Sequence, residues 1–96
     1  MDFQVEPGAV RRLAAAFEAA AERVGQVSGR LAAAVQLSSG AFGLLPEAQS
    51  ARQLYLGKLQ EAEDGLRNLQ AGLQETGLDL RVVASNYEAA DMTSAP

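Results

Sequence analysis

The 96-residue sequence contains no cysteine and no histidine. A disulfide is therefore excluded, and the commonest metal ligand and the usual proton-transfer side chain near neutral pH are both missing. The densest carboxylate group, Glu61, Glu63 and Asp64, has no nucleophile or glycine-rich phosphate loop beside it. We therefore expect no catalytic residues, no metal site, no cofactor and no small-molecule substrate, and the sequence does not predict an enzyme.

Basic residues and long apolar runs are also scarce. The formal net charge is −4 and the pI is about 4.6, whereas a phosphate-binding surface needs clustered lysine and arginine, so nucleic acid is not expected as a partner. Residues 1–8 lack the basic region and apolar run of a secretory signal peptide. No apolar stretch approaches the roughly 20 residues that a membrane-spanning helix needs. We expect a soluble chain without a cleavable signal peptide.

Apolar residues are plentiful, at 48% of the chain, and two segments space them alternately three and four residues apart, as on one stripe of a helix. The first stripe comprises Val10, Leu13, Phe17, Ala20, Val24, Val27, Leu31 and Ala34. The second comprises Tyr55, Leu59, Ala62, Leu66, Leu69, Leu73, Thr76, Leu80, Val83, Tyr87 and Ala90. Such sustained heptads are typical of coiled-coil-like packing.

Prolines and a glycine-containing segment set the expected boundaries. Pro7 and Pro46 suit the first turn of a helix, where a missing N–H costs nothing. The two glycines and two serines in residues 38–45 favour a chain reversal. The sequence therefore predicts a single all-α domain over 1–96, a two-helix antiparallel hairpin: N-terminal arm 1–6, helix 7–37, turn 38–45, helix 46–90 and tail 91–96.

The expected helices differ in length, at about 46 Å for 7–37 and about 67 Å for 46–90. With straight helices we expect Leu80, Val83 and Tyr87 to lie on an overhang that the first helix cannot cover. Either the N-terminal arm, through Phe3 and Val5, or a partner chain would then cover them.

Further apolar residues of the second helix fall off its main stripe. These residues are Leu54, Leu56, Leu78 and Val82, and together with Leu80 and Val83 of the stripe they are the candidates for a partner interface; scattered exposed leucines are the alternative explanation. Glycines inside the helices, such as Gly25 and Gly77, cost roughly 1 kcal/mol each relative to alanine. They indicate either close helix approach or bends, with Gly77 a possible break in the second helix.

The closing segment Tyr87-Glu88-Ala89-Ala90-Asp91 places a phenol and a carboxylate four residues apart, adjacent on one helical face. A carboxylate near a helix C-terminus is mildly unfavourable, so local stability does not explain Asp91. Tyr87 as the last core residue and Asp91 as a solubilising charge is the structural alternative.

Four features of the chain occur together: its hairpin length, a Phe3-x-Val5-x-Pro7 opening, a central glycine turn and a closing Tyr-Glu-Ala-Ala-Asp. In these features the chain resembles the EspC-like branch of the WXG superfamily, type VII (ESX) secretion substrates of actinobacteria. The resemblance implies that Tyr87 and Asp91 form the Tyr-x-x-x-Asp export signal read by the type VII secretion ATPase. The superfamily carries Trp-x-Gly in the turn, whereas this chain has Phe42 followed directly by Gly43. Three interpretations stay open. Phe42-Gly43 is a divergent equivalent of Trp-x-Gly, the true Trp-x-Gly belongs to a partner protein, or Phe42 is a loop aromatic that fills the end of the hairpin core.

The resemblance further implies a protein secreted by the type VII system, cytoplasmic before export, that pairs into a four-helix bundle. The partner is a second copy, another helical-hairpin protein or a toxin N-terminal domain. Two alternatives stay open: an adaptor that lends the signal to a larger toxin or effector, and an intracellular helical assembly protein with no export role.

Overall fold

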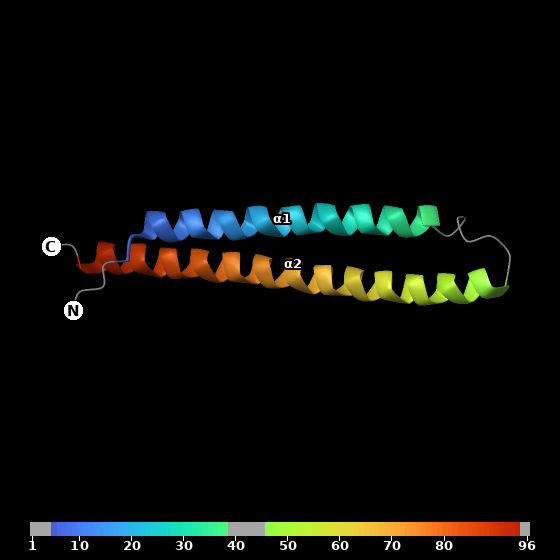
Figure 1. Ribbon diagram of the computed structural model, residues 1–96. Helices are drawn as coiled ribbons and strands as arrows, with labels where there is room; N and C mark the ends of the chain where they lie inside the picture. Colours follow the sequence, from blue (N-terminus) through green and yellow to red (C-terminus); the bar gives the residue numbers. More distant parts are fainter. Residues whose placement is uncertain (1–4, 39–45, 95–96) are drawn as a thin grey trace. The chain divides into compact units, whose positions relative to one another are not determined.

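The computed structural model describes residues 5–38 and 46–94, and within them the chain is entirely helical apart from Val5 and Glu6. Helix α1 comprises Pro7–Ser38 and helix α2 comprises Pro46–Ser94. The two form a helical hairpin (Figure 1). The predicted all-α, two-helix hairpin is confirmed.

Both helices begin at the prolines that the sequence indicated. The N–H of Val10 donates a hydrogen bond of 3.1 Å to the carbonyl of Glu6, which opens the helical hydrogen-bond ladder of α1. The first turn of α2 contains Glu47, whose charge is favourable at the positive end of the helix dipole. Proline at the first position and an acid behind it therefore fix where α2 starts.

Both helices run past their predicted ends. Helix α1 includes Ser38, which was assigned to the turn, and α2 continues to Ser94 instead of ending at Ala90. The sequence between Gly77 and Pro96 contains no further glycine or proline, so no residue there strongly opposes continued helix. The prediction that Asp91 lies in a tail is therefore wrong, because Asp91 is helical.

Contacts divide the chain into two compact units. The terminal unit comprises Met1–Ala21 and Ala71–Pro96, and the central unit comprises Glu22–Gln70. In each unit a segment of α1 lies beside a segment of α2 (Figure 1).

The helices of the terminal unit meet through very small residues. Ala14, Ala21 and Ala84 are the buried apolar side chains, and Gly77 is buried with them. A Cβ on Gly77 would lie 3.1 Å from Cγ of Glu18 and 3.4 Å from the carbonyl oxygen of Ala14. Helix α2 continues through Gly77, so this glycine serves close approach and does not break the helix.

The large apolar residues lie beside this contact rather than at its centre. Ala14 is fully buried while its neighbour Leu13 is 49% exposed. In the central unit Val27 and Leu69 are 47% and 51% exposed, and no described residue there is buried. Large apolar residues of the predicted stripes therefore remain half exposed in both units.

The expected overhang of Leu80, Val83 and Tyr87 is wrong in its cause. Arg11 of α1 bonds to Glu88 of α2, so α1 reaches past all three positions. Leu80 is half-buried, whereas Val83 and Tyr87 keep 40% and 43% of their surface exposed. Their exposure therefore does not follow from a shortage of helix.

We expect Gly77→Leu to destabilise the hairpin by about 1–3 kcal/mol, because the added side chain must displace Glu18 or the backbone of Ala14. Thermal unfolding followed by the helical circular dichroism signal would show a lower midpoint, by about 4–8 °C per kcal/mol for a chain of this size.

Gly57→Ala is the matched control, because nothing lies within 4 Å of a Cβ at Gly57. Alanine should stabilise the helix there by about 1 kcal/mol. Equal effects of the two substitutions would contradict the close approach at Gly77.

Candidate functional site

Tyr87 and Asp91 lie one turn apart on α2 in the terminal unit, and both are exposed. Because α2 continues beyond Asp91, the phenol and the carboxylate share one helical face, as their spacing predicted. The last turn of α2 contains no basic residue. The pair therefore presents an aromatic hydroxyl beside a negative charge close to the C-terminal end of α2.

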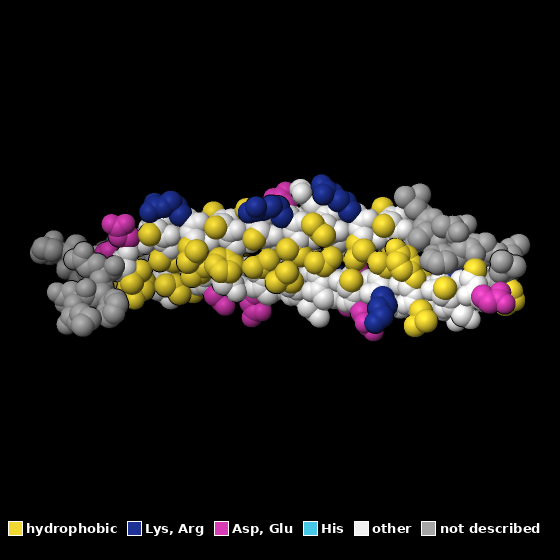
Figure 2. Space-filling view, in the orientation of Figure 1, with side chains coloured by type: hydrophobic (Ala, Val, Ile, Leu, Met, Phe, Trp, Pro, Cys, Tyr) yellow, Lys and Arg dark blue, Asp and Glu magenta, His cyan; other side chains and the backbone are white. Residues whose placement is uncertain are grey.

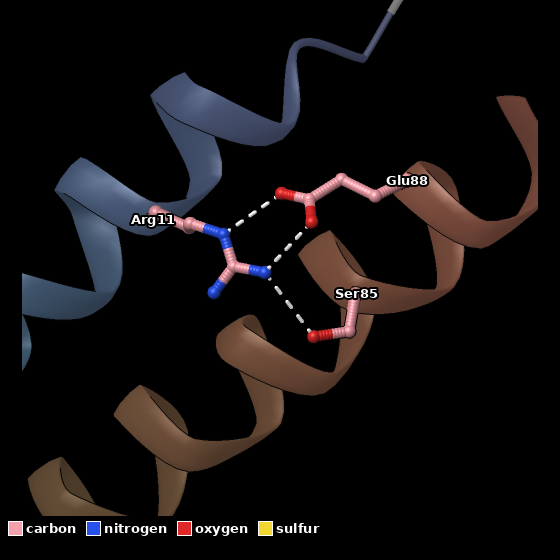
Figure 3. Close-up of polar contacts among 3 residues, drawn as sticks. All are labelled: Arg11, Ser85 and Glu88. Carbon is pink, nitrogen blue, oxygen red and sulfur yellow. Dashed lines mark hydrogen bonds and ion pairs between the residues drawn. The ribbon is translucent and has the colours of Figure 1, made fainter. Parts of the chain in front are cut away.

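Arg11 and Glu88 form an ion pair across the helices next to this position (Figure 3). Nε of Arg11 donates to Oε1 of Glu88 at 2.8 Å, and Nη2 donates to Oε2 at 3.0 Å. Nη2 also donates to Oγ of Ser85 at 3.3 Å. This bidentate geometry holds the carboxylate of Glu88 on the side of α2 that faces α1. Glu88 directly follows Tyr87 in the sequence.

A second pair repeats the first with the charges exchanged. Seven residues further along α1, Glu18 accepts hydrogen bonds of 2.7 and 2.6 Å from Nε and Nη2 of Arg81. Arg81 in turn precedes Glu88 by seven residues on α2. The two pairs define one polar side of the terminal unit and fix the antiparallel register of its helices.

Neither Arg11 nor Arg81 was identified as a candidate site residue from the sequence. The partners are 77 and 63 residues apart along the chain. The available signal was the exchange of charge at heptad spacing, Arg11 and Glu18 in one helix against Arg81 and Glu88 in the other. This exchange of charge can be recognised only once the register between the two helices is known.

The arginine hydrogen bonds lower the pKa of both carboxyl groups. The hydrogen bond from Arg81 is the largest cause for Glu18, and the hydrogen bond from Arg11 is the largest for Glu88. The side chains are 38–45% exposed, so solvent screens the attraction. The pairs are better regarded as register markers than as a main source of stability.

Apolar side chains gather along one face of each unit (Figure 2). By their three-four spacing, the apolar rows of the terminal unit contain Leu13 and Phe17 on α1 and Leu80, Val83 and, at the end, Tyr87 on α2. Beside Phe17 is an open hollow of about 180 Å³, lined by Ala16, Phe17, Ala20 and Leu73. A hollow lined only by apolar side chains is the kind of hole that receives a side chain of a packed partner helix.

The predicted interface residues fall into two groups. Leu80 and Val83 lie in the row that leads to Tyr87, and Leu56 is half-buried in the central unit. Among the described residues, Leu54, Leu78 and Val82 are the most exposed large apolar ones, at 71%, 63% and 57%. In the terminal unit, Leu80 and Val83 thus share a row with Tyr87, whereas Leu78 and Val82 lie off it.

Phe42 and Gly43, the predicted turn motif, lie outside the described residues, as does Phe3 of the N-terminal arm. Residues 5–38 and 46–94 contain no cluster of three or more acidic, histidine or cysteine side chains placed to hold a metal ion. Neither helix, as far as it is described, has a stretch apolar and long enough to cross a lipid bilayer.

Comparison with protein-family models, with curated proteins and with solved structures finds no match to this chain.

The lowered pKa values of Glu18 and Glu88 predict a pH dependence of stability. The pairs stabilise the fold above the pKa of an unfolded glutamate, and this contribution is lost as the pH falls through the folded-state values. Unfolding midpoints of the native chain and of Glu18→Gln/Glu88→Gln should differ at neutral pH and converge in acid. A constant difference across that range would show that the charge of the two carboxylates is not what matters.

Proposed function

We propose that this chain is a type VII secretion substrate or secretion-targeting partner, recognised through Tyr87 and Asp91. The observation that carries the proposal is the exposure of both side chains one turn apart near the C-terminal end of a helical hairpin. The resemblance to the EspC-like branch of the WXG superfamily supports it through the form and place of the motif. The chain is cytoplasmic before export and secreted afterwards, and the secretion ATPase is the partner that reads the motif.

The hairpin acts by packing against a helical partner through its apolar faces. The fully buried side chains are three alanines, and no large side chain is fully buried in the described part of the chain. Half-exposed residues such as Leu13 and Val83 leave substantial apolar area in contact with water, and covering it is favourable by roughly 25 cal/mol per Å². A second pair of helices would complete a four-helix bundle.

The arrangement in the terminal unit explains why one side is available for a partner. Arg11–Glu88 and Glu18–Arg81 lie together on the polar side, whereas Phe17 and the hollow beside it belong to the apolar face. The partner is another helical hairpin or the helical N-terminal domain of a toxin. No group needed for catalysis takes part, so the function is recognition and not chemistry.

Substituting Tyr87→Ala or Asp91→Ala should abolish export, because either change removes one half of the recognised pair. The helical circular dichroism signal should stay nearly unchanged, since both side chains are exposed. Export is measured as the amount of the protein in culture supernatant relative to the cell fraction.

Leu78→Ala is the control for loss of a large exposed side chain, because Leu78 is also on α2 in the terminal unit, is 63% exposed and lies off the apolar row. Glu75→Ala controls for loss of an exposed carboxylate. Wild-type export of Tyr87→Ala and Asp91→Ala would refute the signal.

Val83→Glu should prevent pairing, because a carboxylate then enters the apolar face of the terminal unit. Light scattering on protein purified from the producing cell should give a mass well above the 10.1 kDa chain for the native protein and the monomer mass for Val83→Glu. Leu78→Glu, on the same helix but off the apolar row, should behave like the native protein. A native protein that purifies as a bare monomer would contradict the pairing.

A further inference from the structure

The central unit has an apolar face whose most exposed residues have only basic residues as charged neighbours. Val27, Tyr55 and Leu69 are its most exposed large side chains, with Val24, Leu31, Leu59 and Leu66 half-buried beside them. Residues three and four positions away on a helix are the surface neighbours of a side chain. Those neighbours decide which charges a partner meets at the border of this face.

Basic residues occupy these neighbouring positions on both helices. Arg23 and Arg30 adjoin Val27 on α1, and Arg52 and Lys58 adjoin Tyr55 on α2. No carboxylate stands three or four residues from Val27, Tyr55 or Leu69. Of the five acids in the central unit, Glu22, Glu47, Glu61 and Asp64 adjoin no residue of this face. Glu63 adjoins the half-buried Leu59 and Leu66, but its side chain is only 14% exposed and is bonded to Arg67.

The basic residues of this border lack acidic partners in the described part of the chain. Arg23, Arg30 and Lys58 are exposed, and none of them forms an ion pair there, in contrast to Arg67, which is bonded to Glu63 at 2.6 Å. Nε of Arg52 likewise has no hydrogen-bond partner among the described residues. The positive charge of this border is therefore not neutralised within the described part of the chain.

A second copy of the chain matches this border poorly. Its central unit would bring the same four basic residues. Its terminal unit would bring Asp79 beside Val83 and Asp91 beside Tyr87, both from α2, and Glu6 beside Val10 at the start of α1, while Leu13 on α1 has only apolar neighbours. Two of these three carboxylates lie on one helix, so they match bases carried equally on two helices poorly.

We propose that the apolar face of the central unit docks a helical partner of a different sequence, whose apolar stripe is flanked by carboxylates on both sides. The inference rests on the proposed function, in which the hairpin pairs with a helical partner, and names the chemistry of that partner. Oppositely charged borders favour the correct partner and its orientation, and like charges exclude wrong ones.

The test uses two synthetic helical peptides that share one leucine stripe and carry either glutamates or lysines on both flanks. Fluorescence anisotropy at low salt should show the glutamate peptide binding the native chain at least about tenfold more tightly than the lysine peptide. Raising the salt concentration should reduce this ratio, because exposed charges are screened. Arg23→Glu/Arg30→Glu should reverse the preference, and Arg23→Gln/Arg30→Gln should largely remove it.

Arg12→Glu is the control for net charge, compared with the single variant Arg30→Glu. Arg12 is exposed on α1 in the terminal unit, so its reversal changes the net charge equally without touching the border. Arg12→Glu should keep the native peptide preference, and Arg30→Glu should weaken it.

Three results would overturn the inference: no binding of either peptide, the same preference in Arg23→Glu/Arg30→Glu as in the native chain, or a stable dimer of the chain alone that persists in that variant. The last would assign the face to a second copy. Normal export of Tyr87→Ala would overturn the proposed function and leave the peptide preference standing. Blocked export without a peptide preference would overturn this inference alone.

Discussion

The close contact at Gly77 is the constraint on which the terminal unit depends. With no side chain at Gly77, the backbone carbonyl of Ala14 and the stem of Glu18 lie against α2, and alanines fill the rest of the contact. At this separation the arginines reach their carboxylates directly. The same closeness has a cost, because a contact built from alanine and glycine buries little apolar area. Larger side chains are left at its edge, where Leu13 and Val83 remain half exposed.

Much of the fold was readable because its signals are local. Proline at Pro7 and Pro46 and the uninterrupted three-four spacing define two helices without any knowledge of tertiary structure. The rotation of each helix was not readable, because hydrophobic period identifies a stripe but not the neighbour that covers it. Leucine is more hydrophobic than alanine, so the sequence pattern placed Leu13 and not Ala14 at the helix contact. In the structure Ala14 is buried and Leu13 is half exposed, because the helices approach closely. The end of α2 was missed for a related reason, since no residue near Ala90 stops a helix.

The candidate site divides in the same way. The adjacency of Tyr87 and Asp91 follows from helical spacing alone, so the sequence predicted it. The pairing of Arg11 with Glu88 depends on register between distant segments, and one helical turn of slippage would have matched Arg11 with Ala84 instead. The basic border of the central unit could be predicted from the sequence only in part. Its positions are fixed by helical spacing, but it becomes visible only when Val27 and Tyr55 are known to be exposed.

Tyr87 links packing and recognition in the proposed complex. It continues the apolar row of Leu80 and Val83, yet its hydroxyl must stay accessible if the secretion machinery reads it. Tyrosine suits a position that is apolar on one side and solvent-exposed on the other, because its ring can be buried while its hydroxyl keeps a polar partner. A partner helix that covers Val83 would hold the ring of Tyr87 in place and reduce the conformational freedom lost on recognition. Pairing would then prepare the signal, and a hairpin without its partner would present the same two residues less rigidly.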